Sequence, residues 1–267
     1  MTIQHKLVGD SMQMAVCQLG PGQQVYCEAG KFLWKTPNVS MQTRLGKGAP
    51  GSEPEDGGGS FFKKALNTAT DMGKRALAGE SLAMQWFEAS GDSGLVAFAG
   101  VLPGHMRVIE LDGTKSWMAE KDAFVAAEGG VDFDIAFGGF KAGRKGGEGM
   151  VLERFSGVGT LIIAGAGNFI DLNPAKYGGK LQVDTGCVVA FEESIRYGVE
   201  RVGGLNAQTA MTAMFGGEGL SLATLEGDGQ VIIQSMTFDG LATALASRQG
   251  GSDRKGLTGG LLGGGND

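Results

Sequence analysis

The sequence predicts a mainly β fold in which one element occurs three times, with one inserted amphipathic helix. The three copies begin at Val25, Trp117 and Leu181 and align without a gap. Glycine accounts for 49 of the 267 residues, far above the usual fraction of roughly 7%, and it suits tight turns and bulges better than long helices. A hydrophobic content of 42% is enough to fill a core. We therefore expect a soluble β protein with internal repeats in a pseudo-threefold arrangement.

Residues 1–46 are predicted to be the first β module. The stretch MQMAVCQL, residues 12–19, has the composition of a strand, and the turn sequence Gly20-Pro21-Gly22 follows it. The first copy of the repeat then runs from Val25 through a glycine corner at Gly30. Apolar and polar residues alternate over residues 39–45, which is the pattern of a half-buried strand.

Residues 47–78 are predicted to be an insert that consists of an acidic linker and a helix over residues 61–78. Ser60 is the predicted N-cap, and Gly79 lies just past the helix end. The helix has one apolar face and one basic side, formed by Lys63, Lys64, Lys74 and Arg75. Helices of this kind can lie on anionic membranes, although more of them pack on their own domain. These four side chains are the candidate contacts with a partner or a membrane.

A second element also occurs three times, beginning at Gly79, Gly147 and Gly217. Each copy has an apolar strand, a glycine turn and a second apolar strand, which predicts three hairpins. The predicted second β repeat spans residues 79–143, and the third spans residues 144–203. Residues 204–248 are predicted to hold a closing hairpin and a short helix (241–247), and residues 249–267 a flexible glycine-rich tail.

The order of these elements predicts how the assembly closes. The first module has no hairpin before it, and the last hairpin, residues 217–236, has no module after it. We expect this hairpin to complete the module of residues 1–46. That closure of the two ends of the chain would cover an otherwise open sheet edge.

Several longer stretches resemble a known protein family. They are KRALAGESL, PGHMRVIELDGTKSWMAEKDAFVAA, KLQVDTGCVVAFEESIRYGVERVGG with the following FGGEGL, and GDGQVIIQS. Together they resemble the Altered Inheritance of Mitochondria family of TRAP-like proteins, named for their similarity to the tryptophan RNA-binding attenuator protein. The resemblance implies a β-sandwich of the double-stranded β-helix kind, repeated within the chain and often assembled into rings. The family has no established enzymatic activity, so the resemblance implies no catalytic residues.

The residues themselves also argue against a metal or nucleophilic enzyme. A metal site of the cupin type needs clustered histidines, whereas the chain has only His5 and His105. The cysteines, Cys17, Cys27 and Cys187, lack metal-ligand or redox spacing and are expected to be reduced, mostly buried thiols. The sequence Gly165-Ala166-Gly167 lacks the third glycine of a dinucleotide-binding loop. We expect no cofactor.

One repeat position holds a carboxylate in every copy: Glu28, Glu120 and Asp184. Three such groups near a threefold axis could bind a cation. The alternative, which we prefer, is that each accepts hydrogen bonds from the amides of its own turn. Elsewhere the copies agree on core positions, such as Leu33, Val125 and Val189. The recurring feature of the repeat is therefore packing.

Charge and targeting signals limit the remaining functions. The net charge of −6 opposes generic binding to nucleic-acid phosphates. The N-terminal sequence has no apolar signal region or transit-peptide composition, and we expect a cytoplasmic protein without a transmembrane segment. The leading hypothesis is a non-catalytic, homo-oligomeric binding or scaffolding protein. The alternatives are a binder of small ligands or RNA in clefts between repeats, and peripheral membrane association through the basic helix.

Overall fold

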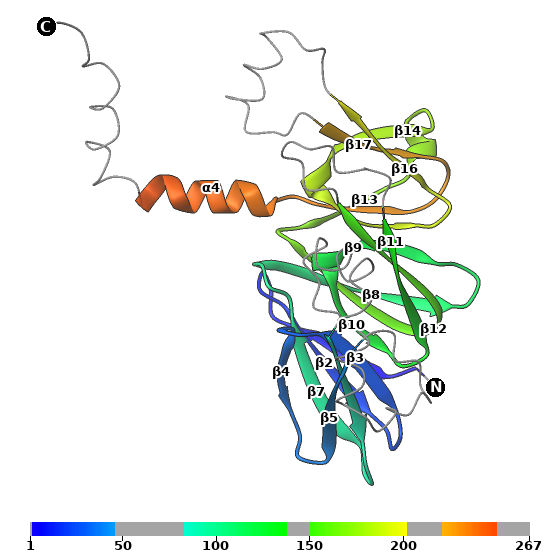
Figure 1. Ribbon diagram of the computed structural model, residues 1–267, viewed down its shortest axis with the longest axis vertical. Helices are drawn as coiled ribbons and strands as arrows, with labels where there is room; N and C mark the ends of the chain where they lie inside the picture. The colour runs from blue at the N-terminus through cyan, green and yellow to red at the C-terminus, as the bar shows by residue number, and fades with distance from the viewer. Residues whose placement is uncertain (1, 46–82, 138–149, 202–220, 250–267) are drawn as a thin grey trace, which may run out of the picture.

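The computed structural model describes residues 2–45, 83–137, 150–201 and 221–249, and its fold is mainly β (Figure 1). The only α-helix in these ranges is α4 (Phe238–Gln249), which confirms the short helix expected near residues 241–247. The predicted helix with Lys63, Lys64, Lys74 and Arg75 lies outside the described residues. The glycine-rich tail from residue 250 onward lies outside them as well.

The strands form three consecutive units, each with six strand positions. The first unit contains β2 (Met14–Leu19), β3 (Gln24–Glu28), β4 (Phe32–Lys35), β5 (Val39–Leu45), β6 (Ala83–Ala89) and β7 (Gly94–Ala99). The second contains β8 (Gly104–Asp112), β9 (Trp117–Glu120), β10 (Phe124–Glu128), β11 (Val131–Phe137) and the long β12 (Val151–Ala166), whose halves supply two positions. The third contains β13 (Phe169–Leu172), β14 (Lys180–Asp184), β15 (Val188–Glu192), β16 (Arg196–Arg201), β17 (Ser221–Glu226) and β18 (Val231–Gln234).

Each unit uses the same antiparallel pairing scheme. The fifth strand lies between the second and the fourth, and the sixth lies between the first and the third. In the first unit, β6 pairs with β3 and β5, and β7 pairs with β2 and β4. In the second unit, the first half of β12 pairs with β9 and β11, and its second half pairs with β8 and β10. In the third unit, β17 pairs with β14 and β16, and β18 pairs with β13 and β15.

The prediction of three hairpins is wrong, because the fifth and sixth strands of a unit do not pair with each other. Each of them is the central strand of its own three strands, so both of its edges are already occupied. The glycine segment between them carries the chain from one sheet to the other. In β12 the strand is continuous, and it changes partners at Gly157 and Gly159, which have φ values of +93° and +144°.

Neighbouring units are joined by pairing the second strand of one unit with the third strand of the next. β3 pairs with β10 at the first junction, and β9 pairs with β15 at the second. The three units therefore follow one another along the long axis of the molecule (Figure 1). Three clusters of buried apolar side chains lie along this row, and each contains residues from more than one unit.

The predicted closure of the two ends of the chain is also wrong. The first unit receives its fifth and sixth strands from residues 83–99, which follow the insert, and not from residues 217–236. Strands β17 and β18 pair only within the third unit, at the opposite end of the molecule from β2 and β3 (Figure 1). The arrangement is therefore an open row.

Two smaller elements flank the row. β1 (Gln4–Val8) pairs with the outer edge of β2. At the other end, α4 projects away from the third unit (Figure 1). The side chain of Thr237 caps this helix, because its Oγ1 accepts a hydrogen bond from the backbone N of Gly240 at 3.0 Å.

Candidate interaction edges of the first and third units

The edge strand β4 carries two exposed apolar side chains at positions that are buried in the other units. Leu33 is 48% exposed and Trp34 is 40% exposed. At the same repeat positions, Val125 and Ala126 are 0% exposed in the second unit. Val189 and Ala190 are 1% and 0% exposed in the third unit. The sequence predicts Leu33 to be a core residue, and in the single chain this prediction is wrong.

The difference in exposure arises from the junctions. β10 and β15 are covered by the second strand of the preceding unit, whereas β4, in the first of the three units, pairs only with β7 among the described residues. The local geometry of the three strands is otherwise alike. Each contains a register shift at the same place: between Phe32 and Trp34, between Phe124 and Ala126, and between Val188 and Ala190. This bulge occurs in all three units, so β4 already has the backbone form of the two covered strands.

The complementary edge is β14, at the other end of the row. Its repeats β3 and β9 each pair with a strand of the following unit, whereas within the described part of the chain β14 pairs only with β17. Leu181 and Val183 are half-buried and pack against the core of the third unit. At the same two positions β3 has Val25 and Cys27, which are fully buried.

Other edge strands differ from β4 and β14 in one respect. The fourth strands, β5, β11 and β16, each pair with one described neighbour, so they are outer edges in every unit. Only β4 and β14 lack, among the described residues, a partner that both of their repeats have.

The polar face of β14 is already neutralised by its own unit. Lys180 forms ion pairs with Glu200 and, at 3.4 Å, with Glu226. The Nε2 atom of Gln182 donates to Glu200 at 2.7 Å. The hydrogen bonds from Lys180 and Gln182 lower the pKa of the Glu200 carboxyl. The charged side chains of this strand are therefore satisfied before any partner arrives.

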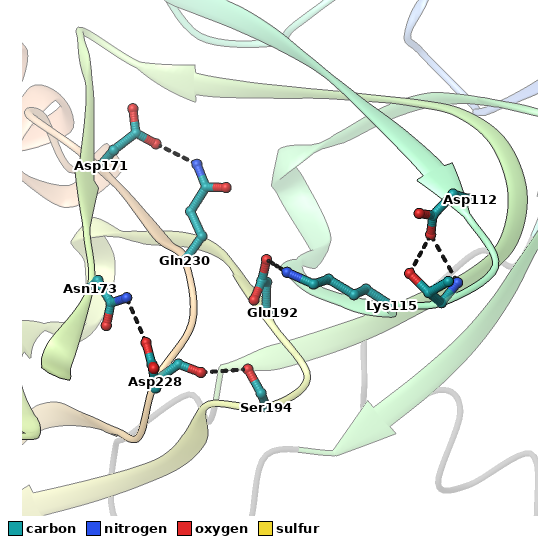
Figure 2. Close-up of polar contacts among 9 residues, drawn as sticks. Asp112, Lys115, Asp171, Asn173, Glu192, Ser194, Asp228 and Gln230 are labelled. Carbon is teal, nitrogen blue, oxygen red and sulfur yellow. Dashed lines mark hydrogen bonds and ion pairs between the residues drawn. The ribbon is translucent and has the colours of Figure 1, made fainter.

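A groove of about 400 Å³ lies at the second junction, between β8 on one side and β15 and β18 on the other. Its apolar lining includes Ile109, Trp117 and Ile232. Across its mouth, the Nζ atom of Lys115 donates to Glu192 at 2.8 Å (Figure 2). At the first junction, the repeat equivalent of Glu192 is Glu128, which accepts a hydrogen bond from the backbone N of Ile3, next to β1. Ile3 is buried in the core cluster of the first junction.

Polar side chains in the groove and beside it are already bonded to one another. Asp171 accepts from the Nε2 atom of Gln230 at 2.8 Å, and Asp228 accepts from the Nδ2 atom of Asn173 at 2.8 Å (Figure 2). A polar ligand would have to break such contacts in order to enter.

Two of the three repeated carboxylates act as acceptors of their own turns, as expected from the sequence. Glu120 accepts from the backbone N of Asp122 at 2.8 Å, and Asp184 accepts from the backbone N of Gly186 at 2.9 Å. Burial, together with the charge of Asp122, raises the pKa of the Glu120 carboxyl to about 7. In the ranges that the structure describes, no three histidine, cysteine or acidic side chains are grouped closely enough to hold a metal ion.

The cysteines are free thiols, as the sequence predicts. Cys17 and Cys27 are buried, and burial raises the pKa of each thiol to about 12, which makes them unreactive at neutral pH. The Nδ1 atom of His105 lies 2.7 Å from the carbonyl oxygen of Gly167. His105 lies on β8, so this contact joins that strand to the residue that follows β12. Within the described residues, no helix has the length and apolar character that crossing a membrane requires.

The fold and its edges define a mainly β protein of three consecutive units. The chain matches the family described as Mitochondrial biogenesis AIM24 over residues 5–236, and it belongs to that family. This confirms the resemblance found in the sequence. It is 27% identical over 238 residues to an uncharacterized protein of Streptococcus pyogenes serotype M6, a match that covers 88% of this chain and 87% of that protein.

A solved structure supports the fold. The crystal structure of protein SPYM3_0169 from Streptococcus pyogenes superposes with a TM-score of 0.68 at 21% sequence identity. The match covers 92% of this chain and 99% of that one. At this level of identity the likeness concerns the fold.

Proposed function

We propose that the protein is a non-catalytic, self-associating scaffold or binding protein whose copies meet through β4. The observation that carries the proposal is the exposure of Leu33 and Trp34 where both repeats bury their counterparts. Exposed apolar side chains on a strand edge that has no partner among the described residues favour association, because apolar surface is costly to leave in water and the backbone groups of the edge are a template for another strand. The positions on which the three copies agree are turns and core. This favours an architectural role for the repeat.

The experiment that tests the proposal is the solution mass of the full chain, measured by light scattering over a range of concentrations. We expect a mass above that of a single chain. We expect Leu33→Lys to shift the protein to the single-chain mass, because an ammonium group would be buried where the repeats bury valine. A penalty of about 2.7 kcal/mol would raise the dissociation constant roughly 100-fold.

The matched control is Met41→Lys. Met41 is 43% exposed, a fraction similar to that of Trp34. It lies on β5, an edge strand whose equivalents in the other units are also edges. This variant should keep the mass of the unmodified protein. A single-chain mass at every concentration, or equal dissociation by both variants, would contradict the proposal.

A further inference from the structure

β4 and β14 each have an edge without a partner among the described residues, and we propose that β14 of one copy pairs antiparallel with β4 of the next copy. The inference rests on the proposed self-association and adds to it the partner strand, the direction of pairing and the register. The occupant of the β4 edge is therefore a second copy of this chain, presented through its opposite end.

The register follows from the two junctions inside the chain. Cys27 lies opposite Ala126 at the first junction, and Ala119 lies opposite Ala190 at the second. These are the same two repeat positions. The corresponding residues at the free ends are Val183 on β14 and Trp34 on β4, because the copies align without a gap.

The neighbouring pairs in this register are compatible with a strand pair. Gln182 falls opposite Lys35 of the next copy, at the positions of Tyr26 and Ala127 in the first junction. Leu181 falls opposite Thr36 of the next copy. No like charges face each other directly, which would destabilise the pair.

The side chains at the two ends also compensate each other in size. At the first junction, Phe87 belongs to the same core cluster as Val125 and Ala126. At the second junction, Phe155 belongs to the same core cluster as Ala190. In the third unit, the position of Phe87 and Phe155 holds the smaller Leu225. In the first unit, the position of Ala126 and Ala190 holds the larger Trp34. A smaller residue facing a larger one preserves the volume of the junction.

The pairing would also give the two terminal sheets the form that the internal ones have. At each internal junction, three strands of one unit continue into three strands of the next, as in β5-β6-β3 with β10-β12-β8. The terminal sheets are β14-β17-β16 at one end and β1-β2-β7-β4 at the other. Their union is a sheet of the same construction. The contact is head-to-tail, so it continues beyond two copies.

The experiment that tests the inference is disulfide trapping in a Cys187→Ser background, which removes the only native cysteine that is not buried. The double variant Trp34→Cys/Val183→Cys is oxidised and run under denaturing, non-reducing conditions. We expect a ladder of multiples of the single-chain mass that collapses on reduction. Mixing the Trp34→Cys and Val183→Cys single variants should give a crosslinked pair and nothing larger, since each copy then has one cysteine.

The matched control is Trp34→Cys/Leu181→Cys, which shifts the register by two residues on the same face and should crosslink poorly. Crosslinking of Trp34→Cys with itself would overturn the inference, because it indicates that two β4 strands meet. An assembled protein that gives no ladder with Val183→Cys would overturn the inference and leave the proposed self-association standing. A protein that is a single chain before any substitution would overturn both.

Discussion

Leu33 and Trp34 show that equal repeat positions can have unequal surroundings. Both have an apolar side chain in every copy, and sequence comparison assigns Leu33 to the core. Only the strand pairing reveals that β4 lacks the neighbour that covers β10 and β15. The apolar character of this site could be predicted from the sequence. The exposure of these side chains could not be predicted, because it depends on whether a neighbouring unit covers the strand.

The carboxylates of the repeat were predictable at the residue scale. An acidic side chain directly before a turn is a local acceptor for turn amides, and Glu120 and Asp184 both act in this way. The raised pKa of Glu120 was not predictable, since it arises mainly from burial in the folded protein.

Glu120 should make stability depend on pH. Its pKa in the folded protein, about 7, is above the ordinary value of 4.5, so the folded state holds the proton more tightly than the unfolded state. The resulting stabilisation is fully present below pH 4.5 and is lost as the pH rises through 7. We expect Glu120→Gln to be more stable than the unmodified protein at pH 8 by on the order of 2 kcal/mol.

Urea unfolding at pH 5 and pH 8, at one protein concentration, measures this effect. Asp184→Asn is the control, because Asp184 caps the equivalent turn through the same kind of hydrogen bond. It reports the cost of changing the cap alone. A free energy of unfolding for Glu120→Gln that falls as steeply with pH as that of the unmodified protein would refute the explanation.

At the scale of elements, the strands follow from the sequence but their partners do not. Apolar runs bounded by glycine predict strand positions well, as for β2, β6, β7 and β18. A glycine segment between two such runs suits either a hairpin or a crossing between two sheets. The choice is made by long-range pairing, because each of these strands acquires two neighbours from elsewhere in its unit.

Gly157 is the crossing point within β12, and its replacement tests this interpretation. The residue has a φ of +93°, and an added Cβ would lie 2.5 Å from the carbonyl oxygen of Gly130. We expect Gly157→Ala to lower the free energy of unfolding by on the order of 3 kcal/mol, because backbone strain and a clash with a rigid neighbour add together.

The control for this substitution is Gly91→Ala. Gly91 also has a positive φ, +76°, but an added Cβ meets nothing within 4 Å. Its replacement should cost roughly 1 kcal/mol, the penalty of the left-handed conformation alone. Thermal unfolding of the two variants compares them directly. Equal losses would mean that the close approach at Gly157 is not a constraint on the fold.

At the scale of the whole molecule, the order of the units follows from the position of the insert. Residues 46–82 separate β5 from β6, so the fifth strand of the first unit lies far from the fourth in sequence. A comparison of repeats alone then makes the first module look incomplete and the last hairpin look unattached. The structure pairs β6 with β3 and β5 across the insert, and the row stays open.

In the part of the chain that the structure describes, the open row leaves one unpaired edge at each end, and the central claim is that these edges meet in other copies. Hydrogen exchange of the backbone amides in β4 and β14, measured at high and low protein concentration, tests this claim most directly. We expect slow exchange at high concentration and faster exchange on dilution, while β5 and β16 do not change. Exchange in β4 and β14 that is independent of concentration would contradict the account.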